Sequence, residues 1–110
     1  MINSQRDGET VLDTTSCYCT LERFGETHGE LIATNQRLLF FGIPMKEWQW
    51  HEIEGLELSY DLHHGPYLRI NQGGEEPYHM TPGNSVDDFY RAANLIMARV
   101  AGDLPWLKDS

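Results

Sequence analysis

Basic residues are scarce in this 110-residue chain, which has 8 lysines and arginines against 17 aspartates and glutamates. DNA, RNA and anionic lipid head groups all repel an acidic surface, and the formal net charge is −9. The composition therefore disfavours a nucleic-acid partner and, less strongly, a membrane partner. Solubility is the commoner consequence of such a balance, although the same charge can steer the protein toward a basic partner.

Cysteine is equally scarce, with only Cys17 and Cys19 separated by one residue. On a strand both side chains point to the same face, which is a poor geometry for a disulfide, and no second pair exists to complete a zinc site. The sequence also has no apolar run long enough to cross a membrane and no apolar signal core near residue 1. We therefore expect a protein of the reducing cytoplasm that uses no metal or cofactor.

Catalytic motifs are missing as well. The chain has no Gly-x-Ser-x-Gly elbow, no pair of histidines at helical spacing and no phosphate-binding glycine loop. Two of the five histidines, His63 and His64, are adjacent, but they lie in a predicted turn where their side chains point apart. These absences predict a non-enzymatic protein. A metal-dependent enzyme that uses His51, His63 or His64 is a minor alternative.

The most informative segment that is present is residues 29–42, GELIATNQRLLFFG. It predicts two short strands at residues 31–34 and 37–41, joined through Asn35 and Gln36 and bounded by Gly29 and Gly42. The order Gly-x-Leu-x-x-Thr-Asn-x-Arg-Leu-x-Phe resembles the β-hairpin of bacterial pleckstrin-homology-like (PH-like) and GRAM domains. That resemblance implies a small binding barrel rather than a catalyst.

Alternation of apolar and polar residues predicts further strands on both sides of this hairpin. They cover residues 9–24, 47–55, 56–60, 67–71 and 77–81, the last as an edge strand. In the first of them Cys17, Cys19 and Leu21 share one face. Residues 23–29 are expected to form a loop, and a slip of phase at residues 53–55 suggests a bulge or a bend.

A helix is predicted at the C-terminal end. Its apolar residues recur at helical spacing and form one stripe: Val86, Phe89, Tyr90, Ala93, Ile96, Met97 and Val100. Ser85 can cap its start and Gly102 is its natural stop.

Seven strands followed by one amphipathic helix is the order of elements in the PH-like fold, in which the helix plugs one open end of a bent barrel. We therefore expect an α+β protein, mainly β, with a PH-like bent barrel of about seven antiparallel strands capped by a C-terminal helix. Residues 9–102 form this domain, after a disordered segment at 1–8 and before a tail at 103–110. A lipocalin-like barrel and a generic α+β sandwich are the alternatives.

Binding of a lipid head group is one function that the resemblance suggests. In lipid-binding members, the loop between the first two strands supplies several basic side chains to the phosphates. Here that loop carries Arg23 and His28 beside two acids, Glu26 and Glu30. Binding of a small ligand or lipid head group at the open barrel end is therefore the alternative hypothesis, with contacts from Arg23, His28, His63 and His64.

Protein binding is the leading hypothesis. If Leu38 and Phe40 line the barrel, as the motif implies, Leu39 and Phe41 point outward, and exposed aromatic clusters mark interfaces. The interface predicted on this basis comprises Leu39, Phe41, Trp48, Trp50 and Trp106. Coverage of these side chains within a monomer is the competing interpretation. Since bacterial relatives are often homo-oligomers, the expected partner is another protein or a second copy of the chain.

Overall fold

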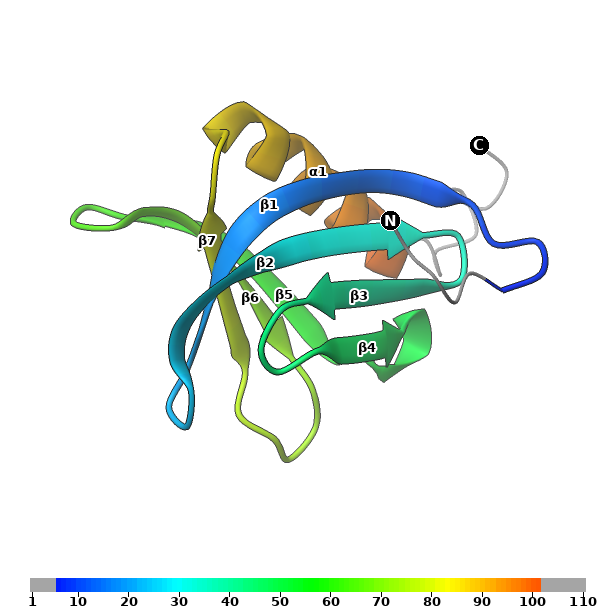
Figure 1. Ribbon diagram of the computed structural model, residues 1–110, viewed down its shortest axis with the longest axis horizontal. Coiled ribbons are helices and arrows are strands. Elements are labelled where there is room, and N and C mark those ends of the chain that lie inside the picture. Colours follow the sequence, from blue (N-terminus) through cyan, green and yellow to red (C-terminus); the bar gives the residue numbers. More distant parts are fainter. Residues whose placement is uncertain (1–5, 102–110) are drawn as a thin grey trace.

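A computed structural model describes residues 6–101 of the chain (Figure 1). A 3₁₀ turn at Trp50–Glu52 separates the fourth strand from the fifth. The elements in chain order are β1 (Val11–Leu21), β2 (Gly25–Thr34), β3 (Arg37–Phe41), β4 (Lys46–Gln49), β5 (Gly55–Asp61), β6 (Gly65–Asn71), β7 (Tyr78–Pro82) and the helix α1 (Val86–Ala101). The helix found in this part of the chain is too short and too polar to cross a membrane.

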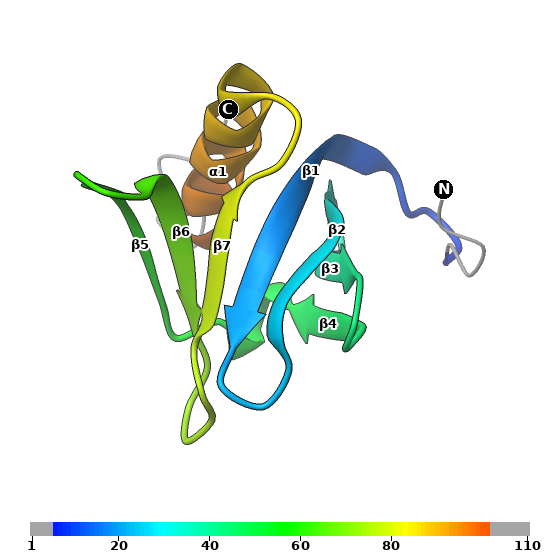
Figure 2. The same cartoon turned by 60° about the vertical axis from the view of Figure 1, so that its left-hand side comes forward.

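All seven strands belong to one antiparallel sheet in the order β4-β3-β2-β1-β7-β6-β5. The long strand β1 pairs with β2 from Val11 to Leu21 and also pairs with β7 from Cys17 to Thr20. Figure 2 shows that the sheet turns sharply at this junction, so that β5–β7 face β2–β4 across the interior. With α1 packed against β1 and β7, this arrangement confirms the expected mainly β, PH-like bent barrel capped by a C-terminal helix.

The interior of the bent sheet holds the hydrophobic core. Cys17, Cys19 and Leu21 share one face of β1, as predicted, and that face points into the core. The largest fully buried side chains are Trp48, Phe40 and Phe89.

The helix closes one end of the barrel with Phe89, Ala93 and Ile96, which are fully buried as their spacing predicts. The backbone N–H of Asp88 donates to Ser85 Oγ at 3.1 Å, which confirms the predicted cap. Val86 is the exception in the stripe because it lies in the first turn, where it remains exposed. Gly102, the predicted stop, lies outside the described residues.

The two glycines that bound the hairpin motif make room for one aromatic ring. A Cβ atom on either Gly29 or Gly42 would collide with the ring of Phe40, which is fully buried. The glycines are therefore needed for close packing around Phe40. This contact explains the two glycines of the motif, and the sequence pattern by itself does not indicate it.

Three of the predicted elements differ in the structure. Residues 23–29 are not a loop: Leu21 pairs with Gly25, so the turn is only residues 22–24, and Gly25 takes the positive φ of 71° that the turn requires. β7 is not an edge strand, since it lies between β1 and β6. The phase slip at residues 53–55 follows the 3₁₀ turn, which separates β4 from β5.

Residues 6–8, grouped with a disordered N-terminus on sequence grounds, form a turn fixed to the hairpin. Asn35 Nδ2 donates to the Gly8 carbonyl at 2.9 Å, and the Thr10 N–H donates to Asn35 Oδ1 at 2.8 Å. The rest of that segment, residues 1–5, lies outside the described residues. The turn holds Glu9 against the barrel, where its side chain is fully buried.

Candidate functional site

The side chains predicted to form an exposed interface are largely covered. Leu39 and Trp48 are each only 1% exposed, so the prediction that they face solvent is wrong. Leu39 does lie on the outer face of the hairpin, but it packs there with Ile32 and a partly buried Phe41. Trp48 pairs with Leu38 across β3 and β4 and therefore shares its inward face.

Trp50 adds little open surface. The indole N–H of Trp50 donates to the Thr34 carbonyl at 3.0 Å, and its partly buried ring packs against the core beside the Arg99 guanidinium. Trp106 lies outside the described residues. The interface predicted from sequence is thus not an exposed aromatic surface in the described part of the chain.

The four predicted ligand contacts do not converge. Arg23 lies in the turn between β1 and β2, whereas His28 lies within β2, where its ring meets the edge of Tyr18 at 5.0 Å. His63 and His64 occupy the turn between β5 and β6, where both N–H groups donate to Asp61 Oδ1. Figure 1 places this turn at the side of the barrel, away from the turn that carries Arg23.

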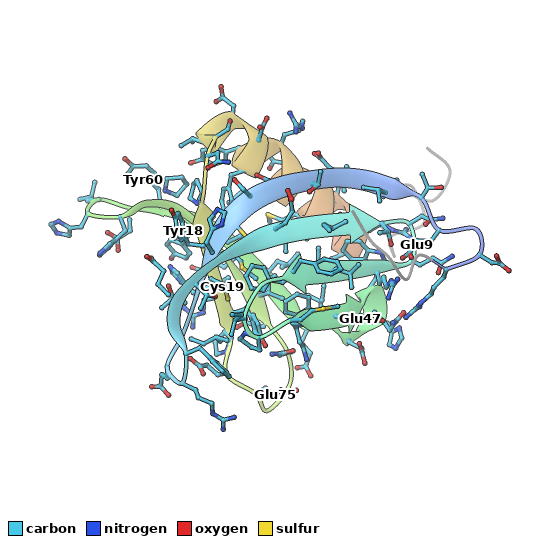
Figure 3. The ribbon with its side chains drawn as sticks, in the orientation of Figure 1. Glu9, Tyr18, Cys19, Glu47, Tyr60 and Glu75 are labelled. Atoms are coloured by element: carbon cyan, nitrogen blue, oxygen red, sulfur yellow. The ribbon has the colours of Figure 1, made fainter. Side chains whose placement is uncertain are left out.

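Three turns meet at the end of the barrel opposite α1 (Figure 1), and their residues line a cleft. The turns are residues 22–24, 42–45 and 72–77, which connect β1 to β2, β3 to β4 and β6 to β7. The cleft has a volume of about 410 Å³ and is lined by Leu21, Arg23, Phe24, Pro44, Gln72, Glu75, Glu76 and Tyr78. Figure 3 shows Glu75 at the tip of the longest of these turns.

Hydrogen bonds join two of the three turns to each other, and fix the third to β2. Buried Gln72 accepts from the Trp48 indole N–H at 2.8 Å through its Oε1 and donates to the Glu76 carbonyl at 3.4 Å. Glu76 Oε2 in turn accepts from the Glu22 N–H at 2.5 Å. The Thr27 hydroxyl donates to the Ile43 carbonyl at 2.8 Å, which fixes the remaining turn to β2. The cleft is therefore held in shape without a ligand.

Large apolar side chains in two of these turns remain open to solvent. Phe24 is 44% exposed, and Ile43 and Met45, which flank the cleft residue Pro44, are 67% and 56% exposed. Below them, the ring of Tyr78 packs edge-on against Trp48 with centroids 5.0 Å apart. Exposed apolar residues gathered around a preformed cleft are typical of binding surfaces.

The charge of the cleft is negative. Its lining has one positive side chain, Arg23, against two negative ones, Glu75 and Glu76. Burial raises the pKa of Tyr78 above its ordinary value, and the nearby Cys19, Glu75 and Glu76 side chains act in the same direction. The field of the two carboxylates therefore reaches the floor of the cleft.

Neither cysteine is arranged for chemistry. Both are free and buried in the wall of the barrel, and burial raises the pKa of each thiol to about 12. A thiol with such a pKa holds its proton at neutral pH and is a poor nucleophile. Within residues 6–101, no group of three or more His, Cys, Asp or Glu side chains could hold a metal ion.

A second hollow, not anticipated from the sequence, lies on the outer face of the sheet. It has a volume of about 520 Å³ and is lined by Thr20, Glu26, His64, His79 and Thr81. The ring of His79 stacks on Tyr67 at 4.7 Å, although the two residues are diagonal neighbours on β7 and β6 rather than direct partners. Sequence alternation places both residues outward but cannot indicate that these strands pair in this register.

Comparison with protein-family models gives no match for this chain. Comparison with curated proteins also gives none. Among solved structures, the chain is similar to the C-terminal domain of an unknown protein from Leishmania infantum, with a TM-score of 0.69. That likeness covers 86% of this chain and 87% of the other at 20% sequence identity, so it shows the fold alone.

Proposed function

We propose that this chain is a non-enzymatic, PH-like binding module that recognises a protein partner at the open end of its barrel. The observation that carries the proposal is the exposure of three apolar side chains in two turns at this end, Phe24 in the cleft lining and Ile43 and Met45 on either side of the lining residue Pro44. Hydrogen bonds anchor both turns, so these side chains have little conformational entropy left to lose on binding. The proposed interface therefore lies at the end of the barrel opposite α1, and not on the hairpin residues, which are covered.

The test is a triple variant, Phe24→Ser, Ile43→Ser and Met45→Ser, with Leu62→Ser as the matched control. Leu62 is 92% exposed in the turn between β5 and β6, so its replacement removes exposed apolar surface elsewhere. Immobilised full-length chain should capture a specific protein from the cells that make it, and the triple variant should lose that protein while the control retains it. Equal capture by all three proteins, with unchanged circular dichroism, would refute the proposal.

Self-association is a special case in which the partner is a second copy. Light scattering over a range of protein concentrations measures it directly. A concentration-dependent rise in mass that disappears in the triple variant would assign the open end to homo-oligomer formation. A monomeric mass at all concentrations would assign it to a different protein.

The alternative hypothesis, binding of a lipid head group at the same end, has weaker physical support. Phosphate recognition in proteins relies on several charge-assisted donors, whereas Arg23 is the one cation in the lining and faces two carboxylates. We therefore expect no co-flotation with acidic liposomes at low salt. Co-flotation that is lost in Arg23→Gln would favour the lipid hypothesis.

A further inference from the structure

We infer that the open-end cleft takes a partner segment in which an arginine or lysine stands beside an apolar side chain. This inference rests on the proposed function and specifies the chemistry of the same site. It is carried by the combination of a preformed cleft, exposed apolar side chains beside it and uncompensated carboxylates.

The carboxylates of the cleft are not neutralised by the protein itself. The Glu75 side chain makes no hydrogen bond or ion pair with residues 6–101, and the Glu76 carboxylate accepts only the Glu22 backbone N–H within that range. Arg23 forms no ion pair with that part of the chain either. By contrast, other arginines are paired with acids, as Arg37 is with Glu9 and Arg91 is with Asp13. The open end thus keeps two carboxylates available to an incoming cation.

The apolar surface beside these carboxylates suits a long basic side chain. Arginine and lysine bury their aliphatic stems on apolar surface while their charged ends remain near acids or water. Phe24 and Tyr78 line the cleft together with Pro44, so a cation held by Glu75 or Glu76 can also lie against an aromatic ring. Ile43 and Met45 on the rim then face the apolar neighbour in the partner segment.

The charges of the cleft argue against an anionic partner segment more strongly than its apolar surface does. An anionic segment would meet two carboxylates in the cleft and a chain with a net charge of −9. A basic segment is attracted by both, and the attraction becomes weaker as salt screens it. Arg23 opposes a basic ligand and assists an anionic one, which makes it a residue whose removal has opposite effects on the two classes.

The experiment uses a short peptide in which leucine alternates with arginine, and a matched peptide with glutamate in place of arginine. Binding to the full-length chain is followed by amide chemical shifts, which should change at residues 23–25 and 72–76 with the basic peptide only. The double variant Glu75→Gln with Glu76→Gln keeps the hydrogen-bond acceptors but removes both charges. It should weaken binding of the basic peptide by about tenfold, because the peptide then loses a close contact with a negative charge.

Two further variants sharpen the result. Arg23→Gln should strengthen binding of the basic peptide, whereas it would weaken any phosphate-bearing ligand. Asp7→Asn with Asp87→Asn removes the same number of charges from the N-terminal turn and the first turn of α1, away from the cleft, and should change affinity by about twofold or less.

Several outcomes would overturn the inference. They are shifts located elsewhere, equal binding of the acidic peptide, no effect of the double glutamine variant, or weaker binding in Arg23→Gln. Failure of the proposed function looks different, because it would appear as undiminished partner capture by the triple serine variant. A partner lost in that variant but insensitive to salt and to the double glutamine variant would leave the proposed function standing and refute the basic chemistry.

Discussion

Arg37 and Glu9 form a buried ion pair that fastens the N-terminal turn to the hairpin. The Arg37 Nε donates to Glu9 Oε2 at 2.7 Å and its Nη2 donates to Oε1 at 2.9 Å, with side chains 5% and 0% exposed. The Thr34 hydroxyl also donates to Glu9 Oε2 at 2.7 Å. Arg37 thus binds Glu9 from within the sequence motif of the hairpin, and Figure 3 shows Glu9 beside the turn between β2 and β3.

Replacing Glu9 by glutamine should destabilise the fold by about 3 kcal/mol or more, because the buried Arg37 guanidinium then loses the negative charge of Glu9. Hydrogen bonding from Arg37 outweighs burial and lowers the pKa of Glu9 from 4.5 to about 2. Because the pKa of Glu9 is lowered in the folded state, its ionised form stabilises the protein at pH values above 4.5. This contribution disappears as the pH falls toward 2. Urea unfolding at several pH values measures both effects.

The control for this variant is Asp7→Asn, which changes an exposed carboxylate in the same turn and should alter stability by no more than about 0.5 kcal/mol. If Glu9→Gln unfolds at the same urea concentration as the control, the pair does not hold the N-terminal turn in place.

Gly42→Ala should destabilise the protein by about 1–3 kcal/mol, since the added methyl group overlaps the ring of Phe40 in a packed core. Gly55→Ala is the matched change in β5, where a Cβ atom would meet its nearest neighbour at 3.5 Å. That variant should be neutral or more stable by up to about 1 kcal/mol, because alanine restricts the unfolded chain. Thermal unfolding of both variants tests the steric explanation, and equal stability would contradict it.

Leucine at position 72 should loosen the open end. Gln72→Leu removes the acceptor of the Trp48 indole N–H, and an unpaired buried donor costs about 1–3 kcal/mol. It also removes the bond to the Glu76 carbonyl, so hydrogen exchange should rise in residues 73–76 more than in β2. Gln36→Leu, which loses an exposed bond to the Asp7 carbonyl, serves as the comparison. Unchanged exchange at the open end would mean that Gln72 does not order this turn.

Cys17 and Cys19 should resist alkylation in the folded protein at neutral pH, because both thiols are buried with pKa values raised to about 12. Both should react rapidly once urea unfolds the chain. Mass spectrometry after iodoacetamide treatment counts the modified thiols. Full modification of the native protein would contradict the burial of this part of β1.

His79 should titrate below its ordinary pKa of 6.5. Partial burial is the main cause, and the positive charges of Arg69 and His64 add to it. The contribution of His79 to folding stability is therefore fully present above pH 6.5. It declines as the pH falls through the lowered pKa of this residue. Ring-proton chemical shifts follow the titration. Arg69→Gln should raise the pKa of His79, and a pKa of 6.5 or more in the original protein would contradict the burial of His79 on the outer face.

Local patterns were enough to locate several elements. The strand at residues 37–41 and the start of the helix at residue 86 agree with the structure, because turn residues, caps and helical periodicity act over a few neighbours. The alternation of Cys17, Cys19 and Leu21 also fixed the inner face of β1 correctly. Such signals depend on backbone geometry within one segment and need no knowledge of distant contacts.

The orientation of the aromatic residues was not accessible in this way. Trp48 points inward because β4 pairs with β3 in a register that sets it opposite Leu38, and Leu39 is covered although it lies on the outer face. The edge position predicted for β7 failed for a similar reason, since its pairing with β1 joins residues about sixty positions apart in the chain. Long-range register is set by the sum of side-chain packing over the sheet, which no short pattern contains.

The sequence by itself determined the class of the fold, the hairpin with its glycines and the acidic character of the chain, all of which follow from local geometry and composition. Only the tertiary structure decided which side chains are covered and which line a cleft. It buried Trp48, partly buried Trp50, and brought Phe24, Pro44 and Glu75, from three separate turns, around one cleft. Closing the sheet through β1 and β7 does this, because the turns become neighbours only once the strands between them have paired.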